Sequence, residues 1–168
     1  MTPAQQHKAH APRHVRVYVL TVSDTRTEEN DEGGRVCREL VESFGHTVVG
    51  KTIVRDEPTL VQAVMGKIAD EQSADVIIST GGTGISRRDS TFEAVSSLLE
   101  KRLDGFGELF RYLSYAEIGS PAMLSRAVAG LCRGLVIFAV PGSPHAVRLA
   151  MEKLIGPELG HLKFEARR

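Results

Sequence analysis

Residues 75–84, DVIISTGGTG, join an apolar run to a glycine-rich turn. The run is short, rich in β-branched residues and bounded by polar residues, which is typical of a buried strand. Glycine has no Cβ, so the backbone N–H groups of the turn can approach a phosphate closely. The hydroxyls of Thr80 and Thr83 add hydrogen-bond donors. The stretch therefore predicts a strand that ends in a phosphate-binding loop, with a plain tight turn as the alternative.

The residues after the turn favour a functional loop over a plain turn. Residues 86–89 (SRRD) lead into a predicted helix, so a phosphate, a cation and a carboxylate could meet there. Ser90 and Glu93 have the S-x-x-E spacing of a capping box, which predicts a helix that runs to about residue 101. The sequence has no G-x-x-x-x-G-K-S/T motif and no complete G-x-G-x-x-G motif. A P-loop NTPase and the dinucleotide fingerprint are therefore excluded.

Outward from this stretch, strand patterns and helix patterns alternate along the chain. Apolar runs rich in β-branched residues predict strands at residues 15–22, 46–54, 75–80 and 134–140. Apolar residues at helical spacing predict a helix after each of the first three strands and a mainly helical stretch at 106–132. Ser143 and Pro144 predict the start of a closing helix. The alternation predicts an α/β fold of three layers, with a mostly parallel, Rossmann-like sheet covered by helices on both faces.

We expect a single domain at residues 15–168, preceded by a disordered tail at residues 1–14. The length of 168 residues fits one domain with its own core. The tail is polar and interrupted by prolines, so it cannot bury enough surface to offset the loss of conformational entropy. Its histidines, His7, His10 and His14, have no cysteine or carboxylate beside them and are expected to be solvated rather than metal ligands.

The composition excludes several classes of function. Hydrophobic residues make up 42% of the chain and charged residues 25%, which is typical of a folded globular protein. Basic and acidic residues balance at 21 each, so nucleic acid is not expected as a partner. No apolar run is long enough to span a membrane, and no membrane partner is expected. Cys37 and Cys132 form no metal-binding or redox motif, which indicates a reduced, cytoplasmic protein.

Four loops with polar or glycine residues follow predicted strands. They carry Ser23-Asp24, Arg55-Asp56-Glu57, residues 80–89 and Gly142-Ser143-Pro144. In a doubly wound sheet, loops after the carboxyl ends of strands converge on one edge, so we expect one binding site there. From its context alone, Asp56 is either a ligand or a helix cap. Asp89 is a ligand, a cap or the partner of Arg88.

Five motifs in this order resemble the MoaB/MogA family, to which the gephyrin G domain is related. They are VSD at 22–24, DE at 56–57, STGGTG with RD at 79–84 and 88–89, GFGELFR at 105–111, and PGSP at 141–144. The resemblance covers residues 15–159. Two departures from the family pattern are Gly33-Gly34, where a serine–glycine pair is common, and Phe92, where a proline is common.

The resemblance implies a molybdopterin-binding protein of molybdenum-cofactor synthesis. Active members of the family use magnesium ATP to adenylylate the terminal phosphate of molybdopterin. Matched by motif, the functional aspartates are Asp56 and Asp89, which are expected to act in catalysis and to hold Mg²⁺ directly or through water. The residues expected to bind molybdopterin and phosphate are Ser23, Asp24, Thr80, Gly81, Gly82, Thr83, Gly84, Arg88, Gly142 and Ser143.

The same resemblance implies an assembly, usually a trimer or a dimer of trimers, and contacts with other molybdenum-cofactor enzymes. Large side chains also crowd one predicted helical segment, and they exceed what a single buried helix face needs. A subunit contact surface is therefore expected at Phe106, Phe110, Tyr112, Leu113 and Tyr115.

Two other functions stay open. The first is a non-catalytic molybdopterin-binding or assembly protein of the same fold, favoured if the departures at Gly33-Gly34 and Phe92 prevent ATP binding. The second is a CinA-like nucleotide-processing enzyme, which shares the TGGxG turn. Arg88 before Asp89 and the block at 105–111 count against this second alternative.

Overall fold

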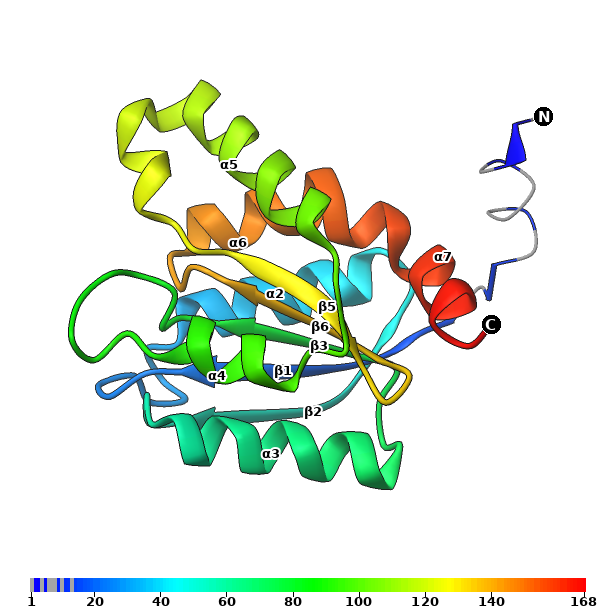
Figure 1. Ribbon diagram of the computed structural model, residues 1–168, viewed down its shortest axis with the longest axis horizontal. Coiled ribbons are helices and arrows are strands. Elements are labelled where there is room, and N and C mark those ends of the chain that lie inside the picture. The colour runs from blue at the N-terminus through cyan, green and yellow to red at the C-terminus, as the bar shows by residue number, and fades with distance from the viewer. Residues whose placement is uncertain (1, 4, 6–8, 10, 13) are drawn as a thin grey trace.

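The protein is built around one mixed sheet, as a computed structural model describes it over residues 2, 3, 5, 9, 11, 12 and 14–168 (Figure 1). Within these residues the sheet has six strands: β1 Arg16–Val22, β2 Thr47–Val54, β3 Val76–Thr80, β4 Lys101–Arg102, β5 Val128–Cys132 and β6 Leu135–Val140. Their order is β2-β1-β3-β6-β5-β4. The first four strands in this order run parallel, while β5 runs antiparallel to β6 and to β4.

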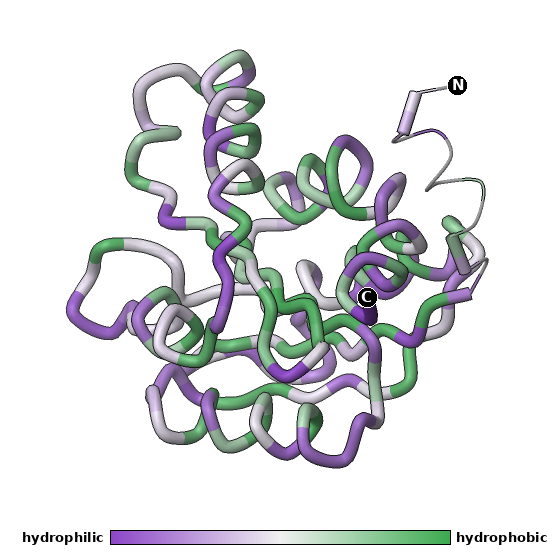
Figure 2. Tube along the Cα trace, turned by 45° about the vertical axis from the view of Figure 1, so that its right-hand side comes forward, coloured by the Kyte–Doolittle hydropathy of each residue, from purple (hydrophilic) through white to green (hydrophobic). Residues whose placement is uncertain are grey.

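Helices cover both faces of this sheet, which confirms the predicted three-layer α/β fold. One face carries α2 (Glu32–Ser43), α5 (Asp104–Ile118), the 3-10 turn η1 (Ser120–Leu124), α6 (Pro144–Ala150), the π-helical turn η2 (Met151–Ile155) and α7 (Gly156–Ala166). The other face carries α3 (Pro58–Glu71) and α4 (Thr91–Leu98). Figure 2 shows the hydrophobic strands between the two helical layers.

The central strand β3 lies between β1 and β6, and all of its residues are buried. A strand that is covered on both faces has little polar–apolar alternation in its sequence. The mainly apolar segment VIIST is therefore typical of a buried strand. Its last residue, Thr80, is in register with Thr21 on one side and Val140 on the other. On the far side of β1, Val22 is in register with Val54. The carboxyl ends of the four parallel strands therefore meet at one edge, as predicted.

The segment predicted as mainly helical at 106–132 is helical only in its first part. After α5 and η1 the chain enters β5, which pairs antiparallel with β6. Nearly every residue of β5 is buried, so no polar–apolar alternation marks it as a strand. A Cβ at Gly130 would lie 2.3 Å from the backbone oxygen of Lys101, so β5 needs glycine to approach β4. The helical prediction is wrong here because tertiary pairing decides the conformation.

The predicted capping box at the start of α4 is also not formed. Ser90 is the N-cap residue, but its side chain makes no hydrogen bond to its own helix. Its hydroxyl donates to Asp56 instead, and Glu93 pairs with Arg126. The helix ends at Leu98, before the predicted residue 101. Both side chains therefore connect different elements rather than cap one.

Part of the predicted tail lies outside the described residues, namely positions 1, 4, 6–8, 10 and 13, which include His7 and His10. Among the described residues, the His14 ring lies 2.6 Å from Thr47 Oγ1. The backbone oxygen of Pro12 lies 2.6 Å from the position of a Cβ at Gly160 in α7. The last residues before β1 therefore contact the domain, and disorder of the tail stays a prediction.

Candidate functional site

The turn after β3 lies at the carboxyl edge of the sheet, in a place where only glycine fits. Gly81 and Gly82 have φ angles of +96° and +72°. A Cβ at Gly81 would lie 2.2 Å from the backbone oxygen of Val22, and one at Gly82 would lie 1.9 Å from Thr91 Oγ1. Any larger side chain would collide with these atoms. The backbone of the turn is therefore held against the end of β1 and the start of α4.

Two carboxylates flank this turn. A Cβ at Gly82 would lie 2.7 Å from Asp56 Oδ2, and one at Gly84 would lie 2.6 Å from Asp89 Oδ2. Asp56 is buried, with only 6% of its surface exposed. The structure therefore brings the two predicted functional aspartates to the two sides of the predicted phosphate-binding loop.

Each aspartate is held by a serine through one carboxylate oxygen. Ser90 donates to Asp56 Oδ1 from its backbone N–H at 3.2 Å and from its hydroxyl at 2.7 Å. Ser86 donates to Asp89 Oδ2 in the same way, at 2.9 and 2.6 Å. No described residue donates to Asp56 Oδ2 or Asp89 Oδ1. Both side chains are therefore fixed in orientation while one oxygen of each stays available.

Neither aspartate has the alternative role that its sequence context allowed. The N-cap residue of α3 is Glu57, so Asp56 does not cap that helix. Arg88 binds Asp24 rather than Asp89, through Nε at 2.9 Å and Nη2 at 3.0 Å. This hydrogen bond lowers the pKa of Asp24 and raises the pKa of Arg88. Because Asp24 Oδ1 also accepts from the Asp56 N–H at 3.2 Å, the ion pair lies at the rim of the site beside Asp56.

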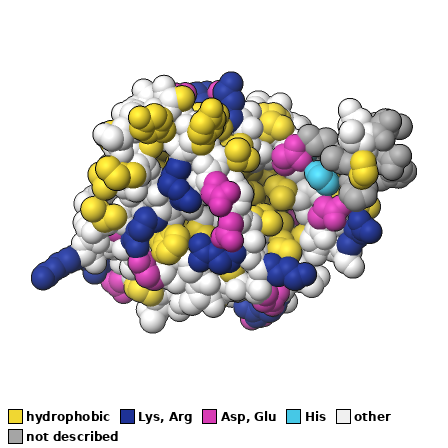
Figure 3. Space-filling model, turned by 45° about the horizontal axis from the view of Figure 1, so that its top comes forward, with side chains coloured by type: hydrophobic (Ala, Val, Ile, Leu, Met, Phe, Trp, Pro, Cys, Tyr) yellow, Lys and Arg dark blue, Asp and Glu magenta, His cyan; other side chains and the backbone are white. Residues whose placement is uncertain are grey.

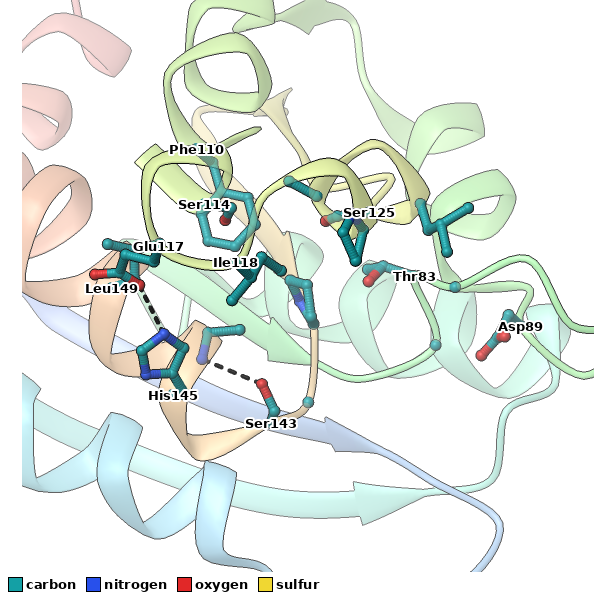
Figure 4. A pocket seen from close by; sticks show the side chains of 18 residues that line it. Thr83, Asp89, Phe110, Ser114, Glu117, Ile118, Ser125, Ser143, His145 and Leu149 are labelled. Atoms are coloured by element: carbon teal, nitrogen blue, oxygen red, sulfur yellow. Dashed lines mark hydrogen bonds and ion pairs between the residues drawn. The ribbon is translucent and has the colours of Figure 1, made fainter. Parts of the chain in front are cut away.

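A cavity of about 440 Å³ opens beside the turn (Figure 4). Thr83 and Asp89 lie at one end of the cavity, and Glu117 of α5 and His145 of α6 lie at the other. The distance from His145 Nε2 to Glu117 Oε2 is 2.6 Å. The lining also includes apolar side chains, among them Phe110, Ile118, Pro121, Leu124 and Leu149. An apolar cavity with a few polar groups at its ends suits a flat ring that carries an anionic group.

A second, polar cavity of about 290 Å³ adjoins the first at Gly142 and Ser143, which line both. It contains the buried carboxylate of Asp31, which accepts from Thr21 Oγ1 at 2.7 Å and from Lys51 Nζ at 2.8 Å. Burial opposes the ionisation of Asp31, but these hydrogen bonds outweigh burial and lower its pKa. The other residues that line this cavity are Val22, Ser23, Arg26, Thr80 and Gly81.

The predicted binding residues are divided between the two cavities and their rim. The larger cavity is lined by Gly82, Thr83, Gly84, Asp89, Gly142 and Ser143. The smaller cavity is lined by Ser23, Thr80, Gly81 and the same Gly142 and Ser143. Asp24, Asp56 and Arg88 lie outside both linings. As predicted, Ser143 caps α6, because its hydroxyl accepts a hydrogen bond from Ala146 N at 3.2 Å.

The structure adds two residues that the sequence patterns did not single out. Ser125 lines the larger cavity, and its buried Oγ has no hydrogen-bond partner among the described residues. Arg126 follows it and binds the backbone of the turn at Gly84. Both lie in the segment predicted as helical, where no local motif marks them. They reach the site only because the chain crosses the sheet edge between η1 and β5.

Several other chemistries find no support among the described residues. No group of three or more His, Cys, Asp or Glu side chains there could hold a metal ion by itself. Cys37 and Cys132 are buried, and burial raises the pKa of the Cys37 thiol to about 12, so it is not a thiolate nucleophile. No described helix has the length and apolar character needed to cross a bilayer.

Known proteins are similar to this chain in sequence and fold. The family described as "Probable molybdopterin binding domain" matches residues 18–161. Molybdenum cofactor biosynthesis protein B of Bacillus anthracis is 52% identical over 164 residues, which cover 97% of each chain. A crystal structure of molybdenum cofactor biosynthesis protein B has a TM-score of 0.90 and 52% identity, and the match covers 94% of this chain and 99% of that one. For the tungsten cofactor synthesizing protein MoaB from Pyrococcus furiosus the TM-score is 0.85 and the identity 38%, over 94% and 100% of the two chains. The chain therefore belongs to the MoaB/MogA family of molybdenum-cofactor biosynthesis proteins, which carry a molybdopterin-binding domain.

Proposed function

We propose that the protein binds molybdopterin in the larger cavity and transfers an adenylyl group from magnesium ATP to its terminal phosphate. The observation that carries this proposal is the glycine turn with Asp56 and Asp89 on its two sides, at one end of an apolar cavity. A pterin is a flat ring system, so it suits the apolar side chains of the lining, while its terminal phosphate would reach the turn.

The turn offers an anion three unused backbone donors. No described residue accepts a hydrogen bond from the N–H groups of Gly82, Thr83 and Gly84. Successive N–H groups in a tight turn form a concave site that binds anions without a formal positive charge. The phosphate of molybdopterin is therefore proposed to bind to these three donors.

Asp56 and Asp89 fit the ligand preference of Mg²⁺, which favours carboxylate oxygens and water. Each keeps one oxygen free of hydrogen bonds from described residues, while Ser90 or Ser86 fixes the other. When bound, Mg²⁺ would offset the repulsion between the two phosphate groups that must approach each other.

In the proposed reaction, an oxygen of the terminal phosphate of molybdopterin attacks the α-phosphorus of ATP. A P–O bond forms between the two substrates, the bond from the α-phosphorus to the β-phosphate oxygen breaks, and pyrophosphate leaves. The turn holds the attacking phosphate, and the two aspartates lie on its two sides. The contribution of the protein is alignment and charge compensation rather than covalent chemistry.

The test compares Asp56→Asn and Asp89→Asn with the parent protein. Asparagine keeps the size of the side chain but loses the charge that would hold Mg²⁺. Each variant should release pyrophosphate about a hundredfold more slowly, which corresponds to about 3 kcal/mol of transition-state stabilisation. Molybdopterin binding, followed by pterin fluorescence, should change little because the turn binds phosphate through neutral donors.

Asp70→Asn is the matched control, because Asp70 is an exposed carboxylate on α3 whose partner is Arg133. It should leave both the rate and the binding unchanged. Near-parental pyrophosphate release in both Asp56→Asn and Asp89→Asn would refute the proposed metal role.

The second candidate function is non-catalytic molybdopterin binding or assembly. The Arg88–Asp24 ion pair favours it, because the cation beside Asp56 is already engaged by a carboxylate rather than open to ATP phosphates. A parent protein that binds molybdopterin but releases no pyrophosphate with magnesium ATP would support this function over adenylyl transfer.

A further inference from the structure

Arg126 holds the phosphate-binding loop through its backbone carbonyl groups. Its Nε and Nη2 donate to the backbone oxygen of Gly84 at 2.9 and 2.6 Å. Nη2 also donates to the backbone oxygen of Asp89 at 3.2 Å, and Nε lies 3.4 Å from that of Thr83. One guanidinium group therefore joins both ends of the segment that runs from the glycine turn to the second aspartate.

Two residues of α4 hold the guanidinium from its other sides. The ring of Phe92 lies below it, with 5.1 Å between Arg126 Cζ and the ring centroid. Glu93 pairs with Nη1, the nitrogen that does not bind the loop. Phe92 stands where the family commonly has a proline, so this departure supplies a cation–π platform in this chain.

The carbonyl contacts matter because of the direction of the peptide groups. A loop that binds an anion must point N–H groups toward it and C=O groups away from it. Arg126 engages the C=O groups of Thr83, Gly84 and Asp89 from outside the larger cavity, since it does not belong to the lining of that cavity. Without the guanidinium, these carbonyl groups would lose a charged donor, and the peptide groups of Thr83, Gly84 and Asp89 would be less restrained in orientation.

We propose that Arg126 is a positioning residue that preorganises the loop at residues 82–89 for the phosphate of molybdopterin. It acts through the loop backbone and does not contact the ligand, because Nε, Nη1 and Nη2 are all engaged by protein groups. This inference rests on the proposed binding of molybdopterin at that loop, but it does not depend on adenylyl transfer.

The experiment uses Arg126→Met, Arg126→Lys and the control Arg133→Met. Arg133 is a half-exposed arginine whose ion pair with Asp70 lies away from the loop. Hydrogen exchange of the two hydrogen-bonded amides of the loop, those of Ser86 and Asp89, is measured in the free protein, and molybdopterin affinity is measured by pterin fluorescence. Arg126→Met should speed exchange of these two amides and weaken binding, each by about tenfold or more. Arg133→Met should change neither.

Arg126→Lys separates positioning from charge. Lysine keeps the charge, but its ammonium group cannot span the three carbonyl groups as the planar guanidinium does. It should therefore recover only part of the lost affinity. Full recovery would mean that long-range charge alone matters, and it would overturn the proposal. Unchanged exchange and affinity in Arg126→Met would overturn it as well.

If Arg126→Met does not fold, Phe92→Leu is a milder test of the positioning role, because it keeps Arg126 and removes only the aromatic ring under its guanidinium. It should increase loop exchange and weaken binding by a factor of a few, whereas parental values in both measurements would contradict the proposal. A parent protein that binds molybdopterin without releasing pyrophosphate would contradict adenylyl transfer, and the exchange and binding results would still decide the role of Arg126.

Discussion

Ser90 donates both its backbone N–H and its hydroxyl to one oxygen, Oδ1, of Asp56, although the two residues are 34 positions apart. The serine occupies the N-cap position of α4 but makes no side-chain bond to that helix. A residue type that usually stabilises its own helix therefore orients a buried carboxylate of the candidate site instead.

Ser90→Ala should reduce both adenylyl transfer and the stability of the protein. Loss of the hydroxyl removes one of the two bonds to Asp56, and a hydrogen bond to a charged group contributes about 1.5–3 kcal/mol. Pyrophosphate release should fall by about tenfold or more, and urea unfolding should show a loss of stability of about 1.5–3 kcal/mol from the same hydrogen bond. Ser97→Ala, in the same helix but hydrogen-bonded to Ala94 O, is the control and should keep the parental rate. Equal rates in Ser90→Ala and Ser97→Ala would contradict the orienting role.

Ser125→Ala should weaken molybdopterin binding by about threefold to tenfold. The Ser125 hydroxyl lines the larger cavity and has no partner among the described residues, so we expect it to bind the ligand. One such hydrogen bond contributes about 0.5–1.5 kcal/mol. Ser96→Ala is the control, because Ser96 Oγ is also buried without a described partner but does not line that cavity. If both variants bind as the parent does, the hydroxyl has no ligand role.

Asp75→Asn should destabilise the protein at neutral pH but not in strong acid. Burial opposes ionisation of Asp75, yet hydrogen bonds from Arg16 and Lys163 outweigh it and lower its pKa to about 2. The folded state therefore favours the charged carboxylate. Above pH 4 this preference contributes about 2 kcal/mol to the free energy of unfolding. This contribution is lost as the pH falls from about 4 to about 2. Urea unfolding should show that the free energies of unfolding of the parent and Asp75→Asn become equal as the pH falls across this range. A difference that stays constant with pH would contradict a stabilising charge on Asp75.

The predicted trimer or dimer of trimers is best tested at the exposed apolar residues of α5 and η1. Phe106 and Phe110 are buried in the core, so they do not belong to the expected contact surface. Tyr112 and Tyr115, which are part of the expected surface, are 72% and 63% exposed, and Met123 of η1 is 75% exposed, so we propose that these three residues form the contact. Figure 3 shows hydrophobic side chains among charged ones on the α5 side of the molecule.

Light scattering at micromolar concentration should therefore report a trimer or a dimer of trimers, and Tyr112→Glu should shift it toward monomers. Ala63→Glu, on the exposed side of α3, is the control and should leave the assembly unchanged. A parental monomer would refute the predicted assembly.

Local sequence patterns were sufficient to predict the layers of the fold and the edge of the sheet at which the candidate site residues meet. The all-apolar β3 and the glycine turn after it are marked by residue types whose conformational preferences act over a few positions. The same holds for Ser143, which caps α6 as its place before Pro144 predicts. Asp56 and Asp89 could be named because they lie in the motifs that carry the family resemblance, whereas their local context alone also allows a helix cap.

Local patterns could not predict which side chains meet across the fold. The sequence pattern does not identify β5 as a strand, because burial on both faces removes the polar–apolar alternation. The spacing of Ser90 and Glu93 predicts a capping box that the structure does not form, and no local pattern marks Arg126.

The sequence by itself therefore determined the class of fold and the glycine turn, which depend on neighbours along the chain, and the family, which depends on the order of its motifs. Only the tertiary structure decided that Ser90 binds Asp56, that Arg88 binds Asp24 and that Arg126 holds the loop. These contacts join residues that are 34, 64 and 42 positions apart. The physical reason is that a hydrogen bond depends on the distance and direction between two groups, and for distant residues the packing of the sheet and its helices sets both.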